Sequence, residues 1–341
     1  MKVAVVVPQL SVQQMLTRAL EGDEYEVDWT ATTGLEALHQ FETRDADVLL
    51  VSVSLHDMTA AELTRRLLAK RSCGVIVLAH DTSEGVSKVY DAMAAGALDV
   101  LRVQAVNGRV SAEAVLAKLR TASRLLGHSS GKMRSIQAGT LLAQSLGRPP
   151  SLIAIGASTG GPQALLTVLS GLPRNVAASI VIVQHVDSEF SEGLATWLQE
   201  GSGIRVELAR PGCAPKPGTA FLAATKDHLI MTSGGSFRYT PEPRALNYRP
   251  SVDVLFASLA QHWRTPGAAV LLTGMGRDGA EGLHKLRKGG WHTIAQEESS
   301  CVVYGMPKAA VQLGAASKVL APGAIAAELA AFVAKRQAAL P

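Results

Sequence analysis

Three residues in the second half of the chain have the types that form a catalytic triad: Ser158, His185 and Asp278. A serine hydroxyl attacks a carbonyl carbon when a histidine takes its proton, and an acid holds that histidine in the correct orientation. Ser158 lies in the string GASTG, which fits the G-x-S-x-G pattern of a serine on a tight turn between a strand and a helix. These residue types predict acyl transfer through a serine nucleophile.

The glycine-rich turn around Ser158 has a second interpretation, because such turns can also bind phosphate on helix amides. The string GASTGG lacks the G-x-G-x-x-G spacing of dinucleotide sites and the G-K-[ST] ending of phosphate-binding loops. The nucleophile interpretation is therefore favoured.

The three triad residues each follow a predicted buried strand. Continuous apolar runs predict strands over 152–155, over 179–185 and at the start of 268–283. The carboxyl ends of parallel strands meet at one edge of a sheet, so we expect the three side chains to lie together there. Their chain order of Ser, His, Asp differs from the Ser, acid, His order of the α/β-hydrolase fold, which excludes that fold.

Asp278 has a competing interpretation as the N-cap of a helix predicted over 279–286. An Asp-Gly pair considered by itself would be predicted to cap a helix. Because Ser158, His185 and Asp278 each follow a predicted buried strand, the triad interpretation is favoured. Cys301 has no partnered base in the sequence pattern and is interpreted as a packing residue. Structural or surface roles are expected for the other histidines of this half, which are His228, His262, His284 and His292.

The first half of the chain alternates between strand and helix patterns. Strands are predicted over 3–7, 25–31, 48–53, 75–79 and 98–103, and helices over 11–21, 34–41, 60–70, 84–95 and 111–126. This alternation predicts an open parallel sheet with helices on both faces. The predicted fold class is α/β throughout. A flavodoxin-like (βα)5 domain spans 1–127, a linker spans 128–150, and a mainly parallel, doubly wound α/β domain spans 151–341.

The amino-acid composition argues against several classes of protein. The chain has 33 basic and 29 acidic residues, a net charge of +4, which is too mild to argue for nucleic-acid binding. Its three cysteines are too few and too far apart for a disulfide framework or a zinc site. No apolar run approaches the ~20 residues of a membrane span, and the N-terminus lacks a full signal-peptide pattern. We expect a cytoplasmic protein without a nucleic-acid partner or membrane insertion.

Residues 1–127 resemble a response-regulator receiver domain in hydrophobic layout and in the strings LHDMTA (55–60) and GALDVL (96–101). That family binds magnesium with two acidic residues after its first strand and is phosphorylated on an aspartate that ends its third. In this chain Pro8 and Gln9 stand at the two magnesium-binding positions, and Ser52 stands at the phosphorylated position. Ala79 ends the fourth strand and Val103 follows the fifth, at two further positions of the family's phosphorylation site.

Aspartyl phosphorylation needs a carboxylate nucleophile, oxygen ligands for Mg²⁺ and a cation on the phosphoryl oxygens. None of these groups lies at a predicted strand end. Asp57 and Asp81 lie nearby in sequence and are interpreted as loop carboxylates, solvated or capping helices. We therefore expect a receiver fold that is not phosphorylated in the usual way.

Residues 151–341 resemble the CheB-type protein-glutamate methylesterases of bacterial chemosensory systems. The matching strings, in the family's order, are IGASTGGPQAL, VIVQHV, RPGCAPKPGTAFLA, RPSVDVLF, LLTGMGRDGAEG and QEESSCVVYGMPKAA. The resemblance implies that Ser158 is the nucleophile, His185 the general base and Asp278 the acid that orients it. It also implies that Thr159, Gly160 and Met275 hold the oxyanion or position the substrate.

The same resemblance implies a substrate, a glutamate γ-methyl ester on the cytoplasmic helices of a chemoreceptor, and glutamine deamidation in some relatives. It implies no metal or organic cofactor, and a chemosensory kinase or adaptor as a partner of the receiver-like domain. Ser251 and Asp253 are interpreted as caps of the helix that follows them, and Arg249 as a residue that could face an acidic receptor.

Two alternatives stay open at the level of sequence. One is a non-catalytic scaffold: residues 1–127 lack the phosphorylation residues of their family, so the second half could have lost its activity as well. A hydrolase of a different ester is the other, because the residues around the triad do not define the substrate.

Overall fold

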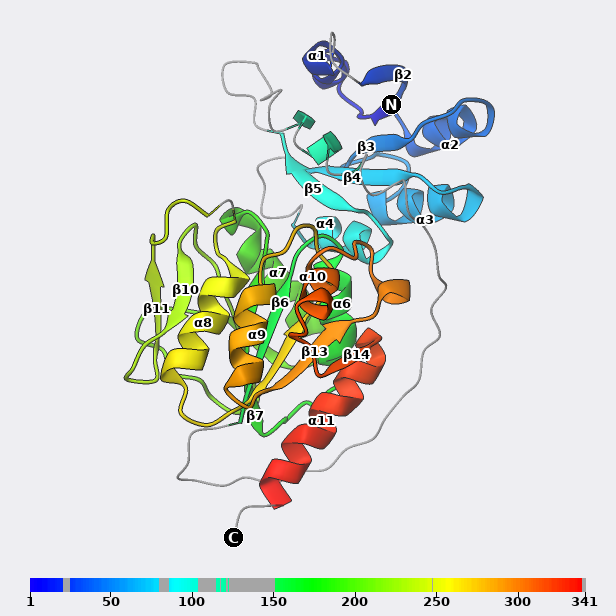
Figure 1. The fold of residues 1–341 in the computed structure, drawn as a ribbon. Coiled ribbons are helices and arrows are strands. Elements are labelled where there is room, and N and C mark those ends of the chain that lie inside the picture. Colours follow the sequence, from blue (N-terminus) through cyan, green and yellow to red (C-terminus); the bar gives the residue numbers. More distant parts are fainter. Residues whose placement is uncertain are drawn as a thin grey trace. The chain divides into compact units, whose positions relative to one another are not determined.

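The computed structural model describes residues 1–20, 25–79, 86–103, 115–116, 118–120, 122, 151–246 and 248–338 (Figure 1). The chain divides into two compact units, with the division after Ser130. The linker predicted over 128–150 lies outside the described residues, so its boundaries stay a prediction.

The first unit contains one parallel sheet in the order β2-β1-β3-β4-β5, which is the flavodoxin-like order. Every residue of β3 and β4 is buried, as helices on both faces require. Its strands are β1 (Lys2–Val6), β2 (Glu26–Ala31), β3 (Val48–Ser52), β4 (Gly74–Ala79) and β5 (Asp99–Arg102).

The helices of the first unit follow the apolar spacing of the sequence. They are α1 (Leu10–Leu20), α2 (Gly34–Thr43), α3 (Ala60–Lys70) and α4 (Val86–Ala94). The helix predicted over 111–126 falls mostly outside the described residues, although residues 115–116, 118–120 and 122 are helical.

The second unit is built on a seven-stranded sheet in the order β14-β13-β12-β6-β7-β9-β8, and every pairing in it is parallel. A separate antiparallel hairpin joins β10 (His228–Met231) to β11 (Phe237–Thr240). The strands of the large sheet are β6 (Ser151–Ala157), β7 (Ala178–Gln184), β8 (Arg205–Leu208), β9 (Thr219–Leu222), β12 (Ala268–Leu271), β13 (His292–Gln296) and β14 (Lys318–Leu320).

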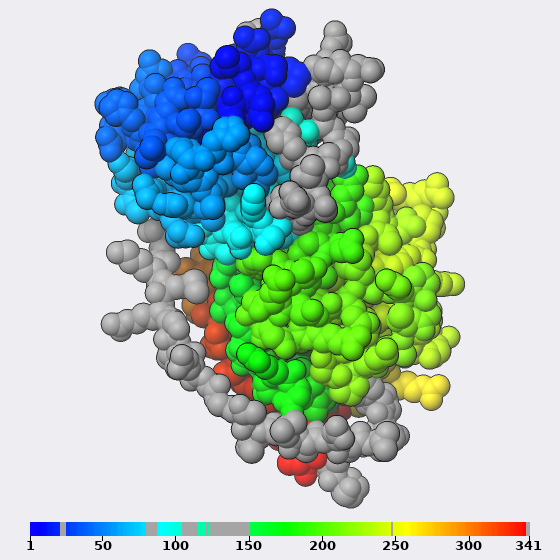
Figure 2. Space-filling model, turned by 180° about the vertical axis from the view of Figure 1, so that it is seen from behind, coloured from blue at the N-terminus to red at the C-terminus, as the bar shows by residue number. Residues whose placement is uncertain are grey.

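Two layers of helices cover this sheet. On one face α6 (Gly161–Ser170) packs against both α7 (Ser191–Ser202) and α11 (Pro322–Ala338). On the other face α9 (Ala280–Lys288) packs against α8 (Val252–His262) and α10 (Met306–Gln312). Figure 1 shows α8 and α9 in front of the sheet, and Figure 2 shows from behind the green surface to which α6 and α7 belong.

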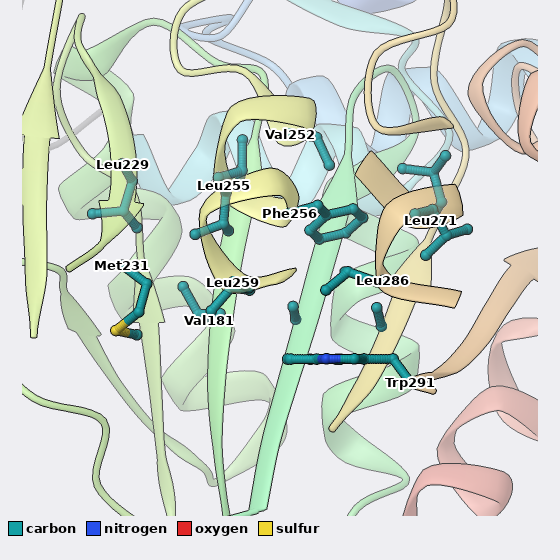
Figure 3. Close-up of a cluster of buried hydrophobic side chains, with 14 of the residues drawn as sticks. Val181, Leu229, Met231, Val252, Leu255, Phe256, Leu259, Leu271, Leu286 and Trp291 are labelled. Carbon is teal, nitrogen blue, oxygen red and sulfur yellow. The ribbon is translucent and has the colours of Figure 1, made fainter. Parts of the chain in front are cut away.

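Between the sheet and α8 and α9 lies a continuous buried cluster (Figure 3). Leu255, Phe256 and Leu259 of α8 reach into it, and each is fully buried. Truncating a buried side chain of this size to Ala typically costs about 2–5 kcal/mol of stability. This packing holds α8 on the sheet, with Val252 of its first turn in the same cluster.

One carboxylate links α8 to α9. Asp253, in the first turn of α8, accepts a hydrogen bond of 2.6 Å from the backbone N–H of Gly282 in α9. Burial raises the pKa of this carboxyl to about 6, partly offset by the Gly282 N–H and reinforced by the nearby Asp278 carboxylate. Because the folded state keeps the proton to a higher pH than the unfolded state, Asp253 lowers stability as pH rises from about 4 to about 6.

Asp253→Asn keeps an oxygen acceptor for Gly282 and removes the buried charge. We expect the variant to be more stable than the wild type at pH 8, by about 1–3 kcal/mol, and to gain much less at pH 4. Thermal unfolding at both pH values measures the difference, at about 2–4 °C for each kcal/mol. Asp187→Asn, at an exposed aspartate of the same unit, is the matched control. An equal stabilisation of Asp253→Asn at both pH values would contradict the buried-charge explanation.

Candidate active site

Ser158 lies on a tight turn directly after β6. Its side chain is almost buried, with the residue 7% exposed. The Ser158 N–H donates to Thr273 O at 3.0 Å, and its carbonyl accepts from Gly161 N at 2.7 Å. Gly160 has a φ of +75°, which side chains rarely adopt, so this turn requires glycine there. The predicted strand, turn and helix around Ser158 are all present.

The loop after β12 runs beside the Ser158 turn. A Cβ on Gly274 would lie 2.6 Å from Ser158 Cβ, so only glycine allows the two backbones to approach this closely. Thr273 Oγ1 donates to Thr159 O at 3.0 Å and fastens the two loops to each other. The close approach of the two backbones and the Thr273 side chain therefore fix the position of Ser158 relative to this loop.

His185 is the residue after β7 and lies beside Ser158. The pairing of Ala157 with Gln184 ends the β6–β7 register, and His185 N extends it by donating to Ala157 O at 3.0 Å. Residues opposite each other on neighbouring strands are about 4.8 Å apart. The sequence therefore placed Ser158 and His185 correctly at one sheet edge.

Gln184 connects these two residues, a role that the sequence reasoning missed. Its Nε2 donates to Ser158 O at 2.8 Å and to His185 O at 3.1 Å, and the residue is 3% exposed. The available signal was a polar side chain at the end of an otherwise apolar buried strand.

Asp278 accepts four hydrogen bonds, and three of them come from the start of α8. Its Oδ2 accepts from His185 Nε2 at 2.8 Å and from Val252 N at 2.7 Å. Its Oδ1 accepts from Ser251 Oγ at 2.7 Å and from Asp253 N at 3.1 Å. Burial raises the pKa of Asp278, but these donors outweigh burial and leave the pKa lowered, so the carboxylate stays ionised at neutral pH.

The ionised Asp278 determines which ring nitrogen of His185 carries the proton. A carboxylate can only accept, so His185 Nε2 must donate, and the neutral ring then has its lone pair on Nδ1. Among the described residues, none hydrogen-bonds to His185 Nδ1, which is buried, or to Ser158 Oγ. His185 therefore has one nitrogen held by an acid and one free to take a proton.

The His185 ring also stacks on Tyr248, which the sequence reasoning did not single out. The ring centroids are 4.5 Å apart and the planes differ by 1°. Three residues after Tyr248, Ser251 N donates to His228 Nδ1 at 3.0 Å, so His228 is structural, as predicted. A tyrosine before the cap of a helix carries no signal of such a contact in sequence.

Backbone N–H groups without a protein acceptor lie next to Ser158. In the part of the chain that the structure describes, the N–H groups of Thr159, Gly160 and Met275 donate to no protein acceptor. Thr159 and Gly160 precede the N-terminus of α6, and Met275 lies in the loop that passes Ser158. Free N–H groups beside a serine can stabilise an oxyanion.

Of the remaining residues interpreted from the sequence, some have the predicted role in the structure and one does not. The alternative that Asp278 caps α9 is wrong, because Gly279 is the N-cap and Asp278 binds the start of α8 instead. Ser251 is the N-cap of α8, as predicted. Arg249 is exposed. Cys301 fits a packing role, since burial raises the pKa of its thiol to about 12.

The corresponding edge of the first unit carries no phosphorylation chemistry at the expected positions. Ser52 is fully buried, and its Oγ accepts from Ser54 N at 3.2 Å. Pro8 and Gln9 follow β1, Ala79 ends β4 and Val103 follows β5. These side chains offer no carboxylate, so they do not fit the magnesium ion of a receiver domain.

Asp57 is engaged elsewhere, as a cap of α2. It accepts from Gly34 N at 2.9 Å and from Leu35 N at 2.8 Å. Burial raises its pKa, but these backbone N–H groups hold it below the usual value. The helix-capping interpretation of Asp57 is confirmed, whereas Asp81 lies outside the described residues.

No helix within the described ranges is long and apolar enough to span a membrane.

Comparison with known proteins identifies both halves. Residues 153–329 match the family model described as CheB methylesterase, and residues 3–105 match the response regulator receiver domain. A Burkholderia lata protein named protein-glutamate methylesterase/protein-glutamine glutaminase 1 is 45% identical over 95% of this chain and 96% of its own. A similarly named Pseudomonas aeruginosa protein is 40% identical over 97% and 99% of the two chains.

A solved structure agrees with these relatives. The Thermotoga maritima CheB methylesterase catalytic domain is 36% identical, with a TM-score of 0.51, over 53% of this chain and 98% of that one. The family model covers more than half of the chain, and the relatives cover nearly all of it. The chain therefore belongs to the CheB methylesterase family, with a response-regulator receiver fold in its N-terminal half.

Proposed function

We propose that this chain hydrolyses glutamate γ-methyl esters on chemoreceptors by a Ser158–His185–Asp278 mechanism. The observation that carries the proposal is the state of His185, which follows the strand next to that of Ser158. Asp278 holds its Nε2 at 2.8 Å, while its buried Nδ1 has no hydrogen-bond partner among the described residues. The names of the relatives, which pair methylesterase with glutaminase, support the substrate class.

In the first step Ser158 Oγ attacks the ester carbonyl carbon, and His185 Nδ1 takes the hydroxyl proton. The imidazolium that forms is stabilised by the ionised Asp278 at Nε2. The bond from Oγ to the carbonyl carbon forms as the carbonyl π electrons move to oxygen. That oxyanion accepts hydrogen bonds from the free N–H groups near Ser158 and Met275, each worth roughly 10²–10³ in rate.

In the second step His185 returns the proton to the methoxy oxygen, and methanol leaves. Water then attacks the acyl-enzyme with the same base, which releases the glutamate carboxylate and restores Ser158. With a glutamine substrate, ammonia would leave in place of methanol, by the same steps. Side chains and backbone N–H groups of this one chain supply the nucleophile, the base, the acid and the oxyanion donors of these steps.

The proposed substrate surface is the methylated cytoplasmic helix of a chemoreceptor. Residues 151–341 carry 17 basic and 13 acidic residues, and the exposed Arg249 and Arg277 lie on the loops that also carry Tyr248 and Asp278. This charge suits an acidic helix. The reaction would take place in the cytoplasm, and a chemosensory kinase or adaptor would be the partner of the receiver-like half.

Ser158→Ala removes the nucleophile but leaves every backbone contact of its turn. We expect methanol release from methylated receptor to fall by at least about 1,000-fold, to the background of receptor alone. Ser170→Ala, on the exposed side of α6, is the matched control and keeps wild-type release. Background release by the wild-type protein would overturn the proposal. Release from small esters but not from receptor would favour a hydrolase of a different ester.

The receiver-like half is proposed not to accept phosphate on aspartate. Incubation of the full chain with radiolabelled acetyl phosphate and Mg²⁺ should leave residues 1–127 unlabelled and the methanol-release rate unchanged, because no carboxylate stands at Pro8, Gln9 or Ser52. A receiver domain with an intact aspartate serves as the positive control. Label on this half, or a rate that rises with acetyl phosphate, would contradict the proposal.

A further inference from the structure

We propose that Tyr248 is a positioning residue of the active site, whose ring fixes the plane of the His185 imidazole. This inference rests on the proposed hydrolase function and adds to it a residue outside the triad. It starts from the parallel stack of the two rings, with centroids 4.5 Å apart and planes 1° apart.

The hydrogen bond to Asp278 does not fix the His185 ring by itself. It holds the single atom Nε2, and the imidazole can still tilt about the line from Nε2 to the carboxylate. No described residue holds the other nitrogen, since Nδ1 lacks a partner. A flat face parallel to the imidazole supplies the missing restraint, because an aromatic ring packed on it opposes any tilt.

Tyr248 is itself held on two sides. A Cβ on Gly276 would lie 3.6 Å from Tyr248 Cε2 and 3.7 Å from Cζ, so the tyrosine ring itself also packs against the loop between Met275 and Asp278. Three residues further along the chain, Ser251 Oγ donates to Asp278 at 2.7 Å. One short segment therefore supplies both the stacking ring and a hydrogen bond to the acid.

This arrangement explains how the His185 ring can be held in one orientation although its side chain makes a single hydrogen bond to the described residues. Its side chain is only 9% exposed, so most of the His185 ring is shielded from water. Tyrosine suits the role because its rigid ring has two side-chain torsions and loses little freedom on packing. The ring is the useful part, and the hydroxyl contributes little to the restraint.

The test compares Tyr248→Leu, which removes the ring but keeps apolar volume, with Tyr248→Phe, which keeps the ring. Leu246→Ala, at an exposed position of the same loop, is the matched control. We measure kcat and KM for methanol release, thermal unfolding, and the His185 ring-proton shifts by NMR, with His185→Gln to assign them. A stacked tyrosine moves these protons upfield, and this signature does not depend on turnover.

We expect Tyr248→Leu to lose about 10- to 100-fold in kcat with KM changed less than twofold, as a displaced catalytic group does. The upfield shift is lost in this variant, while Tyr248→Phe keeps the shift and most of the kcat, and Leu246→Ala resembles the wild type. Wild-type kcat in Tyr248→Leu, an equal loss in Tyr248→Phe, or a change confined to KM would each overturn the inference. If the wild type releases no methanol, the proposed function fails separately, and an absent upfield shift would then overturn the stack.

Discussion

The site depends on one buried carboxylate that is held at the start of a helix. Asp278 accepts from Ser251 Oγ, Val252 N and Asp253 N, and the positive end of α8 adds to the attraction. These bonds leave Asp278 ionised and one lobe of its Oδ2 directed to His185 Nε2. The tautomer of neutral His185, with its proton on Nε2 and its lone pair on Nδ1, follows from this placement.

The sheet brings the three residues together. The strand order reverses at β6, where β7 lies on one side and β12 on the other, and ligands of such sheets bind at this switch point. Ser158 follows β6, His185 follows β7 and Asp278 lies in the loop after β12. Residues from distant parts of the chain thus meet at neighbouring strand ends, and the helices on both faces keep those strands in register.

Much of this could be predicted because buried parallel strands are continuous apolar runs, and a polar residue at the end of such a run stands out. This pattern singles out Ser158, His185 and Asp278 as candidates, and it predicts the strands of the first half and the three strands β6, β7 and β12 of the second. The contacts that hold the triad were not predictable in the same way. The sequence leaves open that Asp278 caps the helix that follows it, but Asp278 binds the start of α8, 25 to 27 positions earlier, and only tertiary structure brings them together. Gln184 and Tyr248 act through contacts across the fold, which residue type alone does not reveal.

The central claim is that Asp278 holds the proton of neutral His185 on Nε2 and leaves Nδ1 free for Ser158. The most direct measurement is the ¹⁵N chemical shift of both His185 ring nitrogens in the full chain, at a pH where the ring is neutral. The account predicts a protonated Nε2 and an unprotonated Nδ1 in the wild type, and the opposite tautomer in Asp278→Asn, whose amide would donate to Nε2. A wild-type His185 with its proton on Nδ1 would contradict the account.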